Sequence, residues 1–311
     1  MTARPRAFRL SRRLGALLGL ALALAAGPVR ADANPYEAEL RARVSEVRAA
    51  ARSPRGILPL LALWDDIGEV RPERGLAALE AVIAERRLAA PTRAYARALR
   101  ARLRLRMGDP EGSRREIDAL GYVRRWRVVG PFDNEGKTGF ERVYPPESGA
   151  ARMGPVDMDA RYEGRERRVG WRVYPDVTRF GYVSFDAVFR PRTNVCGYAE
   201  TFVESERAQP LSLWVGGGGA TRVWWNGEPV LEDTAYRRPH PDRAVALVGA
   251  RRGLNRLLVK ACATDRRWGF YARLGDAAGG APEGIAAVRP TAPAEAVAAI
   301  APDEGPRRLP R

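Results

Sequence analysis

Between Leu211 and Asp276 the chain repeats one pattern: short runs of alternating apolar and polar side chains, separated by glycine-rich turns. A period of two is typical of a β-strand with one buried face. Asn226-Gly227 lies between two such runs and favours a type I′ hairpin turn, in which both central residues need a positive φ. A second turn, Arg252–Asn255, precedes the strand predicted for Arg256–Cys262. This stretch therefore predicts an antiparallel β-sandwich.

The alternation also predicts which side chains face inward. Val223 and Trp225 share one strand face, and Arg222 and Trp224 share the other. In the later strand one face carries Leu257, Val259 and Ala261, and the opposite face carries Leu258 and Lys260. A sandwich needs large side chains between its sheets, so we predict a core position for Trp214, Trp225 and Trp268. The alternative is that these rings form a platform for sugars.

The period of two begins near Tyr122. Further strands are predicted at Trp126–Val129, Val169–Val173, Tyr182–Phe189, Ala199–Val203 and Leu211–Val215. After Asp276 the sequence is rich in Ala, Gly and Pro without a period, which predicts a flexible tail or linker over 277–311.

Upstream, residues 32–121 are predicted to be helical. Asn34 suits a helix N-cap with Pro35 at the first helical position. One helix is predicted from about Gly56 to Val70, and another places Tyr95, Leu99, Leu103 and Met107 four residues apart, with Gly108 beyond its end. The short connections favour antiparallel hairpins, either of the tetratricopeptide type or as a small bundle.

The N-terminus has the pattern of a secretory signal. Five arginines precede an apolar run from Leu14 to Ala26, and Val29-Arg30-Ala31 suits a signal peptidase. We predict cleavage after Ala31, and thus a signal peptide over 1–31 and a periplasmic or extracellular protein. An uncleaved anchor is the alternative, but the run is shorter than the ~20 residues of a membrane span. No other segment suggests a transmembrane helix.

The net charge is dominated by arginine. Loss of six arginines with the signal lowers the formal charge from +16 to +10. The remaining arginines are scattered among acidic residues, so we do not expect nucleic acid as a partner. Anionic envelope polymers are an alternative partner of a basic exported chain.

The chain has two cysteines, Cys196 and Cys262, both in the predicted sandwich. An oxidising compartment favours a disulfide between them. The alternative is two buried free thiols. With one histidine and no paired-cysteine motif, we expect no metal site and no cofactor.

Six blocks of sequence together resemble a known module. In order they are Trp126–Phe132 (WRVVGPF), Gly139-Phe140, Tyr144–Glu147 (YPPE), Val223–Gly227 (VWWNG), Gly253–Asn255 with Leu257–Lys260, and Trp268–Leu274 (WGFYARL). Residues 122–276 thus resemble the galactose-binding-like β-sandwich of large exported bacterial proteins. Those proteins often pair it with tetratricopeptide helices, and some carry a downstream transglutaminase-like domain. The resemblance implies an α+β, multi-domain chain with a jelly-roll sandwich.

One departure affects the site. Related modules carry Ser and Asp in the turn before the VWxNG strand, where this chain has Gly216–Gly219. A ligand contact from that turn is therefore not expected. The candidate ligand-binding patch is Arg222, Trp224 and Tyr236, because an outward aromatic ring beside a guanidinium can stack on a sugar and bind its hydroxyls. The alternative is that Trp224 packs under the helical domain.

We find no catalytic group of residues. His240 lies between two prolines and suits an exposed loop better than a Cys-His pair. Glu232, Asp233 and Asp242 lack the spacing of a calcium loop and suit a solvated acidic loop.

Three functions follow from the sequence. The first is a non-catalytic exported binding or scaffold protein with an envelope glycan or envelope protein as partner. The second is the non-catalytic N-terminal part of a polysaccharide-degrading or transglutaminase-like enzyme. The third is an adaptor that binds proteins through its helices.

Overall fold

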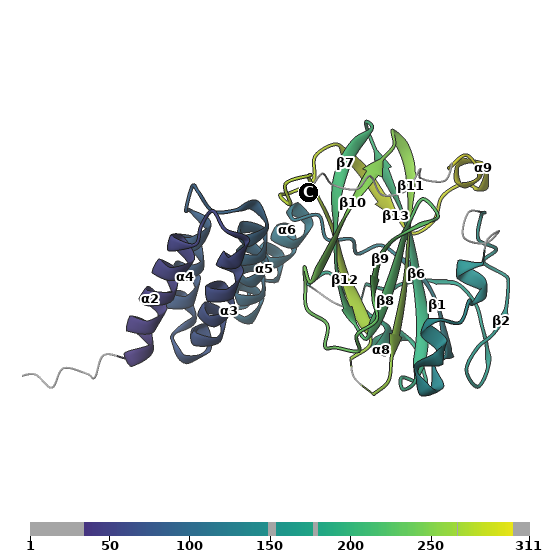
Figure 1. The fold of residues 1–311 in the computed structure, drawn as a ribbon, viewed down its shortest axis with the longest axis horizontal. Coiled ribbons are helices and arrows are strands. Elements are labelled where there is room, and N and C mark those ends of the chain that lie inside the picture. The colour runs from purple at the N-terminus through teal and green to yellow at the C-terminus, as the bar shows by residue number, and fades with distance from the viewer. Residues whose placement is uncertain (1–33, 149–153, 177–179, 266, 301–311) are drawn as a thin grey trace, which may run out of the picture.

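A computed structural model describes residues 34–148, 154–176, 180–265 and 267–300, and shows a group of helices beside an antiparallel β-sandwich (Figure 1). The predicted signal peptide lies outside the described residues. The helices are α2 (Pro35–Ala49), α3 (Ile57–Asp66), α4 (Pro72–Ile83), α5 (Ala90–Arg106) and α6 (Pro110–Ala119), with 3-10 turns η1 (Pro54–Gly56) and η2 (Ile67–Glu69). Helix α2 packs on α3 and α4, α4 packs on α5, and α5 packs on α6. Whether these hairpins are tetratricopeptide repeats stays a prediction.

The predicted helix ends are confirmed by their caps. The Asn34 side chain accepts a hydrogen bond from the Tyr36 N–H at 3.0 Å, with Pro35 at the first helical position. Gly108 follows α5 with a φ of +86°, a conformation that glycine adopts without strain. Asp109 then caps α6 by accepting from the Gly112 N–H at 2.7 Å.

The sandwich consists of two antiparallel sheets. The larger sheet has the order β4-β1-β6-β11-β8-β9, with β13 also paired to β6, and the smaller sheet has the order β10-β7-β12-β5. The strands of the larger sheet are β1 (Arg127–Asp133), β4 (Arg172–Val173), β6 (Val195–Ser205), β8 (Ala220–Trp225), β9 (Glu228–Asp233), β11 (Gly253–Ala263) and β13 (Ile285–Arg289). Those of the smaller sheet are β5 (Tyr182–Ser184), β7 (Gln209–Gly218), β10 (Ala244–Ala250) and β12 (Gly269–Gly275). This establishes the expected α+β class with an antiparallel sandwich, while the jelly-roll assignment stays a prediction.

The main core lies between the two sheets, as the alternation predicted. Strands β8 and β11 contribute Val223, Trp225, Leu257, Val259 and Ala261 to it, and β7 and β12 contribute Leu213, Val215, Phe270 and Ala272.

The outer face of the larger sheet is covered as well. Residues 134–148 and 154–171, which we call the cover segment, carry the 3-10 turns η3 (Glu135–Phe140) and η4 (Pro145–Glu147) and the short hairpin β2 (Tyr162–Glu163) and β3 (Arg168–Val169). Their apolar side chains form a second core with Trp224 and Leu258. Both faces of β8 and β11 are therefore buried.

A buried charged group holds the cover segment to the sheet. The Lys260 ammonium group donates to the carbonyl oxygens of Phe140 and Arg142, both at 2.8 Å, and to the Glu147 carboxylate at 2.6 Å. The Tyr198 hydroxyl donates to the same carboxylate at 2.7 Å. Burial lowers the pKa of Lys260, and the charge of Glu147 opposes that shift.

The helices dock on the smaller sheet. Alanines of α5 form an apolar cluster with Ile117, Leu120, Tyr122 and Tyr271 of β12. The Tyr122 and Tyr271 rings meet edge to face at 6.4 Å. Because the helices contact one sheet and the cover segment contacts the other, the ends of the sandwich are the remaining places for an open site.

The structure corrects the expected turn at Gly216–Gly219. Strand β7 continues to Gly218, and Gly219 alone turns the chain, with a φ of +99°. A Cβ at Gly216 would lie 1.7 Å from the carbonyl oxygen of His240. Glycine is thus needed there for the close approach of another backbone segment.

Two further expectations about elements are wrong. The predicted strand Tyr182–Phe189 ends at Ser184, and Phe185–Val188 forms the helical turn α8. The expected structureless tail contains β13, which pairs with β6, and α9 (Ala294–Ala298). Composition missed β13 because strand pairing satisfies any backbone with free N–H groups, and residues 202–205 of β6 offered an open edge beyond their pairing with β1.

Within the described ranges, no helix is both long enough and apolar enough to cross a membrane.

Candidate functional site: a polar pocket at one end of the sandwich

The three residues of the predicted ligand-binding patch lie in or beside the second core, and each has partners within the protein. Arg222 pairs with Glu232 at 2.8 Å and with Glu141 at 3.0 Å. Its guanidinium lies 4.6 Å from the centre of the Phe140 ring. Both carboxylate partners would compete with a sugar for its N–H donors.

Trp224 is not on an exposed face, so that expectation is wrong. The residue is 4 % exposed and packs under the cover segment with Phe140, Tyr144 and Trp171. The alternation correctly placed its ring opposite Val223, but a distant segment of the chain buries that outer face.

Tyr236 is half-buried and its hydroxyl exchanges hydrogen bonds with Asn134. The Lys137 ammonium group lies 5.0 Å from its ring centre. A ligand role for Tyr236 and Arg222 stays a prediction.

The predicted disulfide is present. Cys196 on β6 and Cys262 on β11 are opposite one another in the antiparallel register, with an S–S distance of 2.01 Å. Their strand positions place them in the second core, under the cover segment.

The remaining candidates have structural surroundings. Trp225 and Trp268 are buried in the main core as predicted. The core position predicted for Trp214 is wrong, because this residue is half-buried on the outer face of β7 with the Arg273 guanidinium 4.8 Å from its ring. The expectation of one solvated acidic loop is wrong: Glu232 and Asp233 end β9 and pair with Arg222 and Arg237, and the Asp242 side chain is buried against Arg273. No cluster of three potential metal ligands occurs in the part of the chain that the structure describes.

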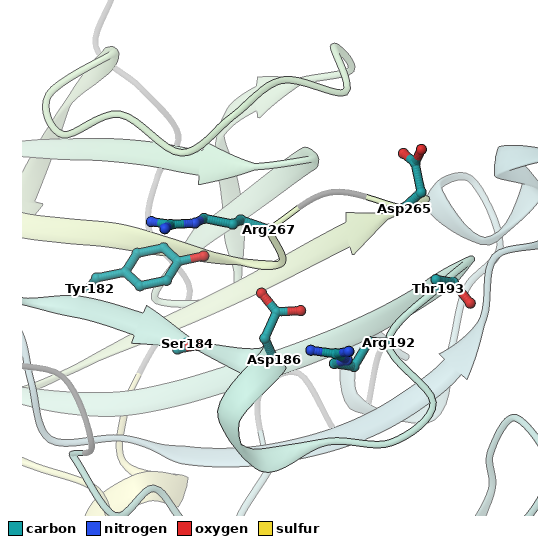
Figure 2. Close-up of a pocket in the computed structure, with 7 residues that line it drawn as sticks. All are labelled: Tyr182, Ser184, Asp186, Arg192, Thr193, Asp265 and Arg267. Atoms are coloured by element: carbon teal, nitrogen blue, oxygen red, sulfur yellow. The ribbon is translucent and has the colours of Figure 1, made fainter.

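A pocket of about 540 Å³ opens instead at the end of the sandwich where β5 and β12 meet. Its lining residues come from three segments: Tyr182, Ser184 and Asp186; Arg192 and Thr193; Asp265 and Arg267. Figure 2 shows the Asp186 carboxylate pointing into the space between Arg192 and the Tyr182–Arg267 pair. The third segment is far from the other two in sequence, and the pairing of β12 with β5 brings it beside them.

Three buried aromatic rings pack together, two of them on residues next to the pocket lining in sequence. Phe185, Phe189 and Trp268 are buried, with ring centres 5.1 to 5.4 Å apart between Trp268 and the two phenylalanines. The backbone N–H of Trp268 donates to the Asp186 carboxylate at 2.7 Å. This contact fixes the carboxylate at the first turn of α8.

Opposing effects act on the pKa of the Asp186 carboxyl group. Burial raises the pKa of its carboxyl group above the ordinary value. The Trp268 hydrogen bond and the positive charges of Arg192, Arg190 and Arg267 oppose the shift. The pocket thus holds a hydrogen-bond acceptor between guanidinium donors, beside the half-buried Tyr182 ring.

Sequence reasoning missed this site. The residues of the pocket have no motif spacing, and Asp186 was assigned to a strand. No local pattern signalled the site, because Ser184 precedes α8 without a capping hydrogen bond and the Asp186 carboxylate accepts from the distant Trp268.

No family model matches the chain, and no curated protein is similar to it. Among solved structures, a family 35 carbohydrate binding module from Clostridium thermocellum shares 20 % identity over 31 % of this chain and 78 % of that one, with a TM-score of 0.23. A β-glucosidase from Kluyveromyces marxianus has 10 % identity, a TM-score of 0.30, and coverage of 49 % of this chain and 16 % of that one. A β-glucuronidase from an uncultured Clostridium has 13 % identity, a TM-score of 0.31, and coverage of 50 % and 29 %. The chain therefore spans less than a third of either glycosidase, and similarity at this level establishes neither a family nor a ligand.

Proposed function

We propose that the chain is a non-catalytic binding module of an exported bacterial envelope protein, and that its end pocket binds carbohydrate. The sequence pattern of a signal peptide supports export, and the disulfide is compatible with it.

The chemistry of the pocket is the observation that carries this proposal. A sugar presents hydroxyl groups that both donate and accept hydrogen bonds, and the pocket offers acceptors in Asp186 and donors in Arg192 and Arg267. Tyr182 adds a partly apolar ring for the C–H face of a sugar. A volume of about 540 Å³ lies within the range of small-ligand sites.

A binding screen on soluble polysaccharides and oligosaccharides tests the proposal. We expect Asp186→Asn to lower the affinity for the bound glycan about tenfold, because a carboxylate accepts a stronger hydrogen bond than an amide. The asparagine oxygen can still accept from the Trp268 N–H, so the fold should persist. Asp159→Asn is the matched control, since Asp159 is exposed and lies outside the pocket. Failure of the wild-type chain to bind any glycan at millimolar concentration would refute the proposal.

A further inference from the structure

A pair of tyrosines lies between the pocket and the helices. Tyr182 lines the pocket, and its ring centre lies 4.9 Å from that of Tyr271 on β12. Burial raises the pKa of Tyr271, and the positive charges of Arg102 on α5 and Arg267 in the pocket both lower it. Tyr271 also packs against the apolar cluster of α5 and α6, so it connects Tyr182 with the helices.

On the helical side, two arginines stack on aromatic rings. The Arg102 guanidinium lies 5.8 Å from the ring centre of Phe180 and 5.4 Å from that of Trp64 on α3. Arg106, one turn further along α5, lies 5.0 Å from the same Trp64 ring. Trp64 thus supports two guanidinium groups that are neighbours on one helix face.

The stacked guanidinium groups retain binding capacity. Stacking uses the flat face of a guanidinium and leaves its edge, with the N–H donors, free for carboxylates. In the described ranges neither Arg102 nor Arg106 forms an ion pair, whereas Arg97 and Arg100 on the same helix pair with Glu116 at 3.0 and 2.5 Å. The pocket arginines Arg192 and Arg267 also lack an ion pair there.

We propose that the pocket and this row form one extended track for an acidic polysaccharide, running from Arg267 past Tyr182 and Tyr271 to Arg102 and Arg106. The inference rests on the proposed carbohydrate binding and adds the class of ligand. Sugar hydroxyls reach Asp186 in the pocket, and carboxylates further along the chain bind the two arginines on α5. An acidic peptide fits less well, because Asp186 repels a polyanion that has no hydroxyl groups to offer it.

Polygalacturonate, digalacturonate and fully methyl-esterified polygalacturonate are suitable probes, because they share one sugar backbone and differ in length or charge. We expect the wild-type chain to bind the acidic polymer more tightly than the dimer or the neutral polymer, and to lose that advantage in high salt. Arg102→Gln with Arg106→Gln should weaken polymer binding about tenfold, or about 1.4 kcal/mol, without changing dimer binding.

Three variants sharpen the comparison. Arg114→Gln with Arg115→Gln removes the same charge from exposed positions on α6 and should leave the affinity unchanged. Trp64→Leu keeps every charge but removes the support of both guanidinium groups, so it should weaken binding of the polymer alone. Asp65→Asn removes the carboxylate next to Trp64 in sequence and should strengthen binding of the acidic polymer.

The outcomes separate the two proposals. The track is refuted if the Arg102 and Arg106 changes have no effect, if the α6 control loses as much affinity, if dimer binding falls equally, or if polyglutamate binds as tightly as polygalacturonate. If neutral and acidic glycans bind equally and Asp186→Asn weakens both, carbohydrate binding stands and the track alone fails. If no glycan binds, both fail.

Discussion

The Tyr95 hydroxyl on α5 and the His240 ring nitrogen Nε2 lie 2.9 Å apart, and the two rings stack with their centres 5.5 Å apart. His240 Nδ1 lies 3.0 Å from the Pro241 carbonyl oxygen, which can only accept, so Nδ1 carries the hydrogen. Nε2 is then the acceptor for the Tyr95 hydroxyl. His240, the single histidine of the chain, thus joins the helices to the sandwich and is half-buried, so the exposed position expected for it is wrong.

Loss of this contact should destabilise the docked arrangement. We expect Tyr95→Phe to lower the free energy of unfolding by about 1 kcal/mol, because it removes a half-buried hydrogen bond and keeps the ring. Urea denaturation followed by tryptophan fluorescence measures the change. Tyr36→Phe, at a residue 39 % exposed, is the control and should behave as the wild type.

Lys260 should be required for stability rather than for binding. Lys260→Met leaves the Glu147 carboxylate buried without its partner, which costs about 3–5 kcal/mol. Adding Glu147→Gln removes the stranded charge, so the double variant should recover part of the loss. Thermal unfolding of the single and double variants tests this, and equal stabilities of the two would contradict the ion-pair explanation.

The disulfide predicts both a thiol count and a stability change. The denatured, non-reduced chain should show no titratable thiol, since both cysteines are bonded. Changing Cys196 and Cys262 together to alanine should cost about 2–4 kcal/mol, because the bridge closes a long loop and restricts the unfolded chain. Reduction of the wild type should cause a similar loss, and two reactive thiols without reduction would disprove the bond.

We expect Trp224 to contribute to the stability of the fold and not to the affinity for glycan. Trp224→Ala removes a large buried ring and should cost about 3–5 kcal/mol. Glycan affinity per folded molecule should stay at the wild-type value, because the ring lies beneath the cover segment. Binding measured well below the melting temperature of the variant decides the point. A selective loss of affinity would restore the patch predicted from sequence.

Glycan affinity should depend on the protonation of Asp186. Burial raises the pKa of its carboxyl group above that of an ordinary aspartate, so protonation occurs at a higher pH than in the unfolded chain. If the ionised carboxylate accepts sugar hydroxyls, affinity is full above that pKa and falls as the pH drops through it. Titration of affinity against pH measures the midpoint, and Asp186→Asn should remove this transition.

The raised pKa of Asp186 also makes the stability of the fold depend on pH. Because the folded state disfavours the ionised carboxylate, this group contributes stability that is fully present below the unfolded pKa and is lost as the pH rises through the folded pKa. Asp186→Asn should therefore gain stability relative to the wild type as the pH increases through that range. Identical pH profiles of unfolding for the two proteins would show that the carboxyl group is not perturbed.

The sequence by itself determined the local structure. Asn34 and Gly108 marked helix ends because their side chains and conformations act on adjacent backbone groups. The alternation of side chains placed Val223 and Trp225 on one face of their strand and Trp224 on the other, since successive side chains on a strand point in opposite directions.

Only the tertiary structure decided what covers each face. The outward position of Trp224 suggested exposure, but the cover segment, far away in sequence, packs on it. Pairing of β13 with β6 ordered part of a tail whose composition suggested a linker. The pocket forms because β12 pairs with β5 and brings Arg267 beside Tyr182 and Asp186. Periodicity reports neighbours along the chain, whereas exposure and site geometry depend on contacts between segments that no local pattern specifies.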